Sequence, residues 1–422
     1  MRRRKRKPWG WGPTARIHTM MDALEGITGV EFGSFAAGPG IGKYLANFGA
    51  RVIHVESAER PDGLRTHYPP FKDNKPGLNR AGAFAFWNDS KYGVTLNLKH
   101  PQGLELAHRL VEKSDFVVEN MRPGVMARLG LGYDELKKRN RRLVLLSTSN
   151  MGQTGPYADH PGFGSQLSSL SGFSELIGRA DGPPLFIYGP YIDLIAVAYG
   201  GIALLAALDH QRRTGEGSHI DLSQYEAGLQ FVAAPLIDFA VNGNIARRNG
   251  NRDPVAVPHG CYPCRNGRWC VISCWDEEEW ERFCYAAGLP ALLRDAQFAT
   301  ASERRAHEAE LNERISQRTR EEDADRLMHR LQESRVHAAA VRTMRELFSD
   351  PQIAARDVWQ KQRHGEMGEH HYRMGSFQLT ETPGCVRKPA PCLGEHNEEI
   401  FCGWLGLEPN SYRELEKKGV FS

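Results

Sequence analysis

The sequence lacks an uncharged stretch long enough for a membrane-spanning helix. Its longest apolar run, residues 194–208, is shorter than the roughly 20 residues that cross a bilayer. No apolar segment follows the basic cluster at residues 2–7, so this cluster does not have the pattern of a secretion signal. We therefore expect a soluble, cytoplasmic protein with no membrane partner.

Cysteine is sparse, and its spacing is not typical of a disulfide framework. Eight cysteines are scattered over 422 residues. Cys261, Cys264, Cys270 and Cys274 lie close together, but zinc-binding pairs normally stand about 15 residues apart. The segment from Cys270 to Cys274 is instead typical of a buried strand, in which cysteine acts as a small hydrophobe. We therefore predict no metal site.

The net positive charge of the sequence comes from its N-terminus. Residues 2–7 are all arginine or lysine, and removing their six charges from the net charge of +3 leaves −3. A nucleic-acid-binding protein needs a basic face on its folded domains, so we expect no nucleic-acid partner. Residues 1–20 are predicted to form a disordered basic tail, although a localisation or phosphate-contact role for residues 2–7 stays open.

Short apolar segments alternate with helical patterns through the first half of the sequence. Strands are predicted at 29–32, 51–56, 115–118, 143–147 and 220–222, and helices at 41–48, from Pro101 and from Asp193. The last of these helices should end near Arg213, because Gly215 follows a basic final turn. The alternation predicts an α/β fold with a Rossmann-like parallel sheet covered on both faces.

The character of the sequence changes near residue 245. A turn-rich segment at 250–254 precedes a strand pair joined through residues 265–267, and charged helices follow between 300 and 335. We therefore predict a large domain at 21–244 and a smaller α+β domain at 245–345. Residues 346–422 are expected to return and pack on the large domain.

A glycine-rich turn follows the first predicted strand. Gly38, Gly40 and Glu56 partly match the dinucleotide-binding fingerprint. The third glycine position is occupied by Lys43, however, and Pro39 removes an N–H donor that would face a pyrophosphate. An NAD-dependent oxidoreductase therefore stays an alternative on weak evidence.

Two basic residues lie where an α/β sheet presents its ligands, and one acid precedes the long apolar run. Lys99 follows the apolar pair Leu96 and Leu98, and Arg128 follows a Pro-Gly turn; both suit a phosphate-rich ligand, although each could be ordinary surface charge. Asp193 is the one acid before the apolar run. A carboxylate there is either a helix cap or a nucleophile kept away from water.

Several segments together resemble the family III coenzyme A transferases, which are typified by formyl-CoA:oxalate and carnitine CoA-transferases. They are Ala37-Gly38-Pro39, Val52 to Glu56, Leu98-Lys99, Val118 to Asn120, Arg122-Pro123-Gly124, Gly152 to Pro156, Arg213 to Gly217, Gly250 to Arg252, Pro389 to Pro391 and Leu393 to His396. The likeness runs from about Leu24 to Leu407.

The resemblance implies roles for the candidate residues. It makes Asp193 the catalytic nucleophile and assigns Lys99, Arg128, Ala37 and Gly38 to coenzyme A, which is a substrate together with acyl-CoA and a carboxylic acid. No prosthetic group is implied. The resemblance also implies an interlocked homodimer, although some relatives pair homologous subunits, and a non-catalytic CoA-binding subunit stays an alternative.

Two departures from the family pattern reduce the number of reactions that we expect of this chain. The formyl-CoA branch has a glutamine where this chain has Ala36, which disfavours oxalate–formate exchange. The racemase branch has a histidine after a Pro-Gly step, where this chain has Phe163, and His160 is a poor substitute. The second base needed for α-proton exchange is therefore missing.

Two further groups of residues are weaker candidates. Oxyanion donors are expected among the backbone amides of residues 36–38 and of the 249–251 turn. Arg65 and Arg252 are candidates for binding a second carboxylate of an acceptor acid.

Overall fold

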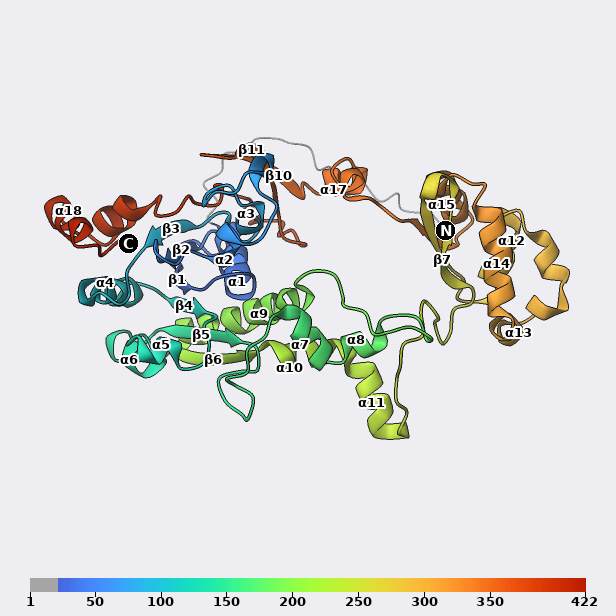
Figure 1. Ribbon diagram of the computed structural model, residues 1–422, viewed down its shortest axis with the longest axis horizontal. Helices are drawn as coiled ribbons and strands as arrows, with labels where there is room; N and C mark the ends of the chain where they lie inside the picture. The colour runs from blue at the N-terminus through green and yellow to red at the C-terminus, as the bar shows by residue number, and fades with distance from the viewer. Residues whose placement is uncertain (1–21) are drawn as a thin grey trace, which may run out of the picture.

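A six-stranded parallel sheet forms the centre of the larger part of the molecule (Figure 1). The computed structural model describes residues 22–422, so the predicted tail at 1–20 lies outside the described residues. The strands are β1 (Thr28–Phe32), β2 (Arg51–Glu56), β3 (Tyr92–Thr95), β4 (Phe116–Glu119), β5 (Val144–Ser149) and β6 (Ser218–Ser223). Their order in the sheet, β3-β2-β1-β4-β5-β6, is that of a Rossmann sheet. Strands are added on one side of β1 up to β3 and on its other side from β4 onward, so the order switches between β1 and β4 although all strands run parallel. The predicted α/β fold with a parallel sheet is confirmed.

The inner strands β1, β4 and β5 are buried on both faces, which explains why they are short and mainly apolar. In β2, Val52 packs into one core, while Ile53 and Val55 pack into the other. Successive side chains of a strand point to opposite faces, so a strand covered on both sides favours apolar residues at most positions.

Three helices cover one face of the sheet. They are α1 (Ala37–Asn47), α3 (Gly82–Asn88) and α9 (Tyr191–Thr214). Their buried side chains include Ile41, Trp87 and Leu204. α9 ends at Gly215, whose φ of 79° is the left-handed conformation that commonly terminates a helix.

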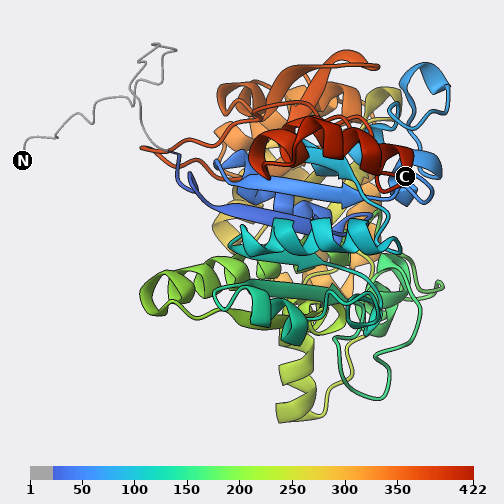
Figure 2. The same cartoon turned by 90° about the vertical axis from the view of Figure 1, so that its left-hand side faces the viewer.

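The opposite face is covered by helices from both ends of the chain. α4 (Pro101–Glu112) and α6 (Tyr133–Arg139) share this core with α18 (Pro409–Lys417) and the π-helical segment Glu399–Trp404. Figure 2 shows α4 and the C-terminal helices side by side in front of the sheet.

A smaller unit lies apart from the sheet, at the right of Figure 1. Its antiparallel strands β7 (His259–Pro263), β8 (Trp269–Ser273) and β9 (His337–Ala340) pack against α12 (Glu277–Ala286), α13 (Ala301–Ala306), α14 (Glu308–Thr319) and α15 (Ala324–Glu333). Cys270 is buried in its core, and burial raises the pKa of the Cys270 thiol to about 12. Within residues 22–422, no group of three or more His, Cys, Asp or Glu side chains is placed to hold a metal ion.

The chain then returns from this unit to the sheet. It passes through α16 (Met344–Leu347), α17 (Pro351–Ala355) and the hairpin of β10 (Trp359–His364) and β11 (Gly368–Arg373). Backbone hydrogen bonds then tie it to β3 and the loop after it, from His396 N–H to the Gly93 carbonyl (3.0 Å) and from Asn97 N–H to the Val420 carbonyl (2.8 Å). The remaining short helices are α2 (Gly63–Thr66), α5 (Val125–Arg128), α7 (Gly164–Leu170), α8 (Phe173–Leu176), α10 (Gln224–Leu229) and α11 (Ala233–Asn242).

α9 is longer than the sequence pattern predicted. It begins at Tyr191 rather than at Asp193, and its 24 residues are long and apolar enough to cross a membrane by length and composition alone. Ile195, Val197 and Leu204 are nevertheless buried against the protein core. The helix was predicted from Asp193 to near Arg213, so its ends were nearly correct, but the apolar run 194–208 alone underestimated its apolar length.

Candidate active site

The carboxyl ends of β4 and β5 and the segment after β1 surround a pocket of about 270 Å³ that contains Asp193. Ligands of open α/β sheets bind at this edge, beside the point where the strand order reverses. The lining side chains come from well-separated parts of the sequence. They include Ser34, Phe35, Asn120, Met121, Arg122, Thr148, Ser149, Asn150, Phe163, Asp193 and Gln224.

Asp193 is positioned by the first turn of α9. It is the third residue of the helix, and the buried side chains of Ile192 and Ile195 fix this turn on the protein core. Pro190 precedes the helix and provides no side-chain cap. Asp193 is half-buried. The helix therefore presents a carboxylate to the pocket from its amino-terminal end.

The environment of Asp193 disfavours its charge. Burial raises the pKa of the Asp193 carboxyl to about 6, opposed only by a hydrogen bond with its own backbone. The amino-terminal end of α9 favours the anion, typically by about 0.3–1 kcal/mol. At pH 7 and above the group is therefore mostly ionised but poorly solvated, which is the state that a carboxylate nucleophile needs.

A glycine allows a neighbouring helix to approach this carboxylate. Gly164 is the first residue of α7, and a Cβ atom at this position would overlap the Asp193 carboxylate. Any side chain larger than hydrogen at residue 164 would therefore displace one of the two helices or turn the carboxylate away.

Two asparagines hold the loops that form the pocket walls. Asn120 accepts a hydrogen bond from the Ser34 N–H (2.9 Å) and donates one to the Ser34 carbonyl (2.7 Å). Asn150 donates to the Gly162 carbonyl (3.0 Å). These bonds link the ends of β4 and β5 to the loops opposite them, so the walls are fixed by the sheet.

A second pocket of about 360 Å³ adjoins the first and contains Lys99. Ser34 and Met121 line both pockets, so the two lie next to each other and share part of their walls. The Lys99 N–H donates to Asn97 Oδ1 (3.1 Å), and Asn97 is in turn held by the Val420 carbonyl. The C-terminal return thus supports the loop that carries Lys99.

Charged groups of both signs line this second pocket. Lys99 and Arg60 contribute positive charge, whereas Glu56, Glu59 and Asp62 contribute carboxylates. Asp62 accepts hydrogen bonds from the Phe35 and Leu64 amides, and burial raises the pKa of its carboxyl to about 6.

The structure brings only part of the predicted site together. Lys99 and Asp193 line adjoining pockets, but Arg128, Ala37 and Gly38 line neither. Arg128 is exposed at the end of α5, next to Leu129 on the wall of the second pocket. Ala37 and Gly38 are buried in the first turn of α1, directly after Ser34 and Phe35.

The glycines of the dinucleotide-like motif serve helix packing. Gly40 faces Val197 of α9 so closely that a Cβ atom would clash, and Gly42 faces Glu31 of β1 in the same way. Glu56, the residue that would hold a ribose, instead accepts hydrogen bonds from Arg65 Nη2 (2.7 Å) and Nε (2.9 Å). Close helix packing therefore explains the glycines, and the ion pair with Arg65 explains Glu56, without a bound dinucleotide.

The two arginines proposed for a second carboxylate are already paired. Arg65 is only 1% exposed and is bound to Glu56, while Arg252 Nε lies 2.7 Å from Glu308. The 249–251 turn lines a different pocket, of about 510 Å³, beside Tyr262 of the smaller unit. The prediction for Arg65 was therefore wrong, because its carboxylate partner is a residue of the protein itself.

Three polar residues at the end of β5 were missed by sequence reasoning. Thr148, Ser149 and Asn150 all line the pocket of Asp193. The sequence does contain a feature that could have identified them. The apolar run Val144–Leu146 changes to polar residues at the carboxyl end of a parallel strand, where ligands bind.

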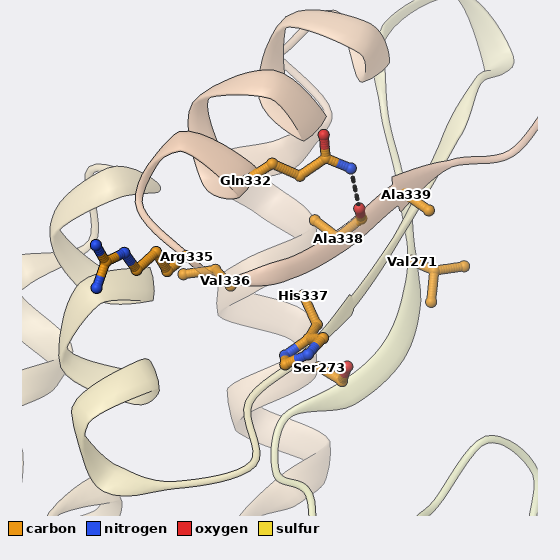
Figure 3. Close-up of a pocket in the computed structure, with 8 residues that line it drawn as sticks. All are labelled: Val271, Ser273, Gln332, Arg335, Val336, His337, Ala338 and Ala339. Atoms are coloured by element: carbon orange, nitrogen blue, oxygen red, sulfur yellow. Dashed lines mark hydrogen bonds between the residues drawn. The ribbon is translucent and has the colours of Figure 1, made fainter. Parts of the chain in front are cut away.

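Another pocket, of about 530 Å³, lies on the smaller unit, lined by residues of the paired strands β8 and β9 and of the end of α15 (Figure 3). In Figure 3, Gln332 donates to the Ala338 carbonyl (2.8 Å), and Arg335 points away from the strands. His337 is engaged by Glu279, with 2.7 Å between Nδ1 and Oε1. None of the predicted site residues lies there.

Comparisons of the sequence and of the structure with known proteins agree on one protein family. The sequence model described as CoA-transferase family III matches residues 24–397. Succinyl-CoA–D-citramalate CoA-transferase of Chloroflexus aurantiacus is 34% identical over 401 residues, which are 94% of this chain and 98% of that protein. The beta subunit of succinyl-CoA–L-malate CoA-transferase from the same organism is 31% identical over 406 residues, 94% of this chain and 98% of the subunit. The crystal structure of a CAIB/BAIF family protein from Brucella suis matches with a TM-score of 0.84 and 29% identity, covering 91% of this chain and 99% of that one.

Proposed function

Because the chain belongs to CoA-transferase family III, we propose that it moves CoA from an acyl-CoA to a free carboxylic acid through covalent catalysis by Asp193. The observation that carries this proposal is the environment of Asp193. A half-buried carboxylate with a pKa raised to about 6 lies in a pocket at the switch point of the sheet, next to the pocket of Lys99.

The two adjoining pockets suit the two ends of coenzyme A. In this proposal Lys99 binds the phosphates of the nucleotide, with Arg60 and the exposed Arg128 adding positive charge nearby. The pantetheine arm then passes Ser34 and Met121, and the thiol reaches Asp193. Contacts with the nucleotide keep the thiolate in place after the first bond is broken.

The reaction has two equivalent halves. The Asp193 carboxylate attacks the thioester carbonyl, forming a mixed anhydride and releasing CoA thiolate, which stays bound. The thiolate then attacks the Asp193 carbonyl carbon of the anhydride, so that the donor acid leaves as a carboxylate and an aspartyl-CoA thioester remains. The acceptor carboxylate attacks this thioester, and the same steps in reverse release the new acyl-CoA and free Asp193. No prosthetic group is needed.

Backbone amides are the proposed oxyanion donors. The first amides of α1 follow Ser34 and Phe35, which line the pocket. Donors at the start of a helix are fixed before the reaction and stabilise the negative charge that develops on a carbonyl oxygen.

We propose short dicarboxylic acids as substrates. The two relatives described above are named for succinyl-CoA together with D-citramalate or L-malate. A pocket of about 270 Å³ suits an acyl group of this size better than a long fatty-acyl chain.

We further propose that a second subunit covers an exposed apolar surface formed by α9 and α11. Its exposed side chains are Leu194, Tyr199, Ile202, Leu205, Leu236, Ile237, Phe239 and Val241. α11 has no buried residue and projects from the larger part of the molecule (Figure 1). An isolated helix of ten residues is marginal in water, so this surface is expected to be an interface, in a homodimer or with a homologous subunit.

A CoA-exchange assay tests the proposed function. The full chain is mixed with succinyl-CoA and a panel of free acids, and new acyl-CoA species are measured by mass spectrometry. We expect ping-pong kinetics and a loss on the order of 10³-fold or more in kcat for Asp193→Asn. Asp209→Asn, at the exposed end of the same helix, is the matched control and should retain activity. CoA binding without turnover would indicate a non-catalytic subunit, and no CoA binding would contradict the proposal.

A further inference from the structure

Phe35 has a strained backbone conformation in the wall of the Asp193 pocket. Its φ of 63° lies in the left-handed region, which residues with a bulky side chain rarely adopt. Among the non-glycine residues of positive φ in the described range 22–422, Phe35 alone lines this pocket. Such strain persists only where surrounding contacts hold it, and it concentrates at functional sites. A neighbouring group must therefore hold Phe35 in this conformation.

The Asp62 carboxylate holds Phe35 through its backbone. The Phe35 N–H donates to both carboxylate oxygens, at 3.2 Å from Oδ1 and 3.1 Å from Oδ2. Asp62 Oδ1 also accepts from the Leu64 N–H (2.8 Å), so the same side chain caps α2. Asp62 is only 3% exposed, and its own N–H donates to Glu56 Oε1 (3.0 Å) at the end of β2. The carboxylate is therefore fixed by the sheet, and its oxygens bind two amides of the protein.

The conformation of Phe35 affects two parts of the proposed site. The Phe35 ring packs edge-on against Phe163, with 5.7 Å between the ring centroids. Phe163 lines the same pocket and precedes Gly164, whose backbone approaches the Asp193 carboxylate. Residues 36–38, whose amides are the proposed oxyanion donors, directly follow Phe35 in the chain. A change in the Phe35 backbone would therefore displace both the start of α7, beside the nucleophile, and the first turn of α1.

We propose that Asp62 is a positioning residue for the reaction, which keeps Phe35 in its left-handed conformation and thereby keeps Asp193 and the first amides of α1 in their reactive arrangement. This inference rests on the proposed function, since it takes Asp193 to be the reacting group. Asp62 also lines the pocket of Lys99, where its negative charge opposes the binding of phosphates. Its contribution to the site is therefore the backbone that it holds.

The first measurement separates rate from binding. The full chain is incubated with succinyl-CoA at increasing concentrations, and the rate of adduct formation on Asp193 is followed by rapid quench and intact mass. In Asp62→Ala, the rate at saturation should fall about 10- to 100-fold, as expected when a reacting group is misplaced by about 1 Å. The concentration for half-saturation should not rise, because a negative charge has been removed from the phosphate pocket.

Two control variants separate positioning from the loss of a helix cap. Asp350 caps the short helix α17 by accepting from two backbone amides, and it lines neither pocket, so Asp350→Ala should keep the wild-type rate. Asp62→Asn keeps one side-chain oxygen that the Phe35 and Leu64 amides can share, and should recover most of the rate lost in Asp62→Ala.

Two variants of Phe35 show whether Asp62 acts through this residue. Phe35→Gly and Phe35→Ala both remove the ring, but only glycine adopts a left-handed φ without strain. Adding Asp62→Ala should lower the rate at saturation about tenfold or more in the Phe35→Ala background, and about threefold or less in the Phe35→Gly background. A side chain that serves only the stability of the fold would give the same loss in both backgrounds.

Hydrogen exchange of single amides gives a readout that does not depend on activity. The Phe35 amide should be protected in the wild type, and it should exchange about tenfold faster or more in Asp62→Ala, because its acceptor is removed. The Thr28 amide, which donates to Asp115 Oδ2 (2.9 Å), should keep its protection in the same variant.

The outcomes distinguish this inference from the proposed function. A wild-type rate in Asp62→Ala, an equal loss in the two Phe35 backgrounds, or an unprotected Phe35 amide in the wild type would each overturn the role of Asp62. No adduct in the wild type, with succinyl-CoA or with a panel of other acyl-CoAs, would instead overturn the proposed function on which this role rests.

Discussion

At the scale of single residues, Asp193 combines a position that favours a negative charge with surroundings that penalise it. The start of α9 stabilises the anion, while burial raises the pKa of its carboxyl to about 6. The free-energy cost of burying the ionised carboxylate contributes to the proposed chemistry, because a poorly solvated carboxylate reacts more readily than one surrounded by water.

We predict that the rate of adduct formation on Asp193 falls in acid with an apparent pKa of about 6. Only the ionised carboxylate attacks, so the second-order rate constant should drop about tenfold for each pH unit below that value. Rapid-quench measurements between pH 4.5 and 8.5 give this profile. A flat profile over this range would contradict the assignment of Asp193.

The folded state should be favoured by the protonated form of Asp193, whereas the reaction requires the ionised form. The pKa of Asp193 is higher in the folded protein than the ordinary value of 3.8, so ionisation destabilises the fold above pH about 6 and has little effect once both states are protonated. Asp193→Asn should therefore raise Tm at pH 8, and the increase should shrink toward pH 4. Thermal unfolding at both pH values measures this difference.

Gly164 tests the geometry around the same carboxylate. We predict that Gly164→Ala lowers kcat about 100-fold, because its Cβ atom would overlap the Asp193 carboxylate and move it from its reactive position. Gly403→Ala is a matched control, since an exposed Cβ there meets nothing within 4 Å. Near-wild-type kcat in Gly164→Ala would show that the approach of α7 does not matter for the reaction.

A network of buried charges next to the site serves stability. Arg65 binds Glu56, and the Arg65 guanidinium lies 3.5 Å over the Phe84 ring. We predict that Arg65→Met lowers the free energy of unfolding by about 3–5 kcal/mol, because it leaves the Glu56 carboxylate buried without its partner. Lys138→Met, which breaks the exposed pair with Glu135, should change it by less than about 0.5 kcal/mol. Chemical denaturation of both variants compares the two effects.

At the scale of elements, sequence patterns located the central strands better than the edge strand β3. The segment 51–56 was predicted with the observed boundaries, because Val-Ile-His-Val is a continuous β-branched and apolar run. β3 was missed, since its four residues include a glycine and show no alternation. It is stabilised by pairing with β2 and by the C-terminal return, both of which are long-range contacts.

α11 is the opposite case, because it has no buried residue in the single chain and we propose that a second subunit covers it. If the proposed interface exists, Phe239→Asp should destabilise the oligomer enough for monomer to appear at micromolar concentration in sedimentation velocity, because a charge would replace an aromatic side chain of the proposed interface. Gln317→Asp on the exposed face of α14 should leave the assembly unchanged. A wild type that is monomeric throughout would contradict an interface on α9 and α11.

At the scale of the whole molecule, the fold class could be predicted from the sequence, but the site only in part. Alternation of strands and helices sufficed for the parallel sheet, and the family resemblance led to Asp193 and Lys99. The pocket itself is assembled from segments between Ser34 and Gln224, which only the folded sheet brings together. For the same reason Arg65 could not be recognised as the partner of Glu56.

The central claim is that Asp193 becomes covalently attached to CoA during the reaction. Intact-mass spectrometry after incubation with succinyl-CoA tests it directly, with peptide mapping and hydroxylamine treatment. We expect an adduct with the mass of CoA less one water that maps to Asp193, is released by hydroxylamine and is absent in Asp193→Asn. An adduct on another residue, or acyl transfer that proceeds equally well in Asp193→Asn, would contradict the mechanism.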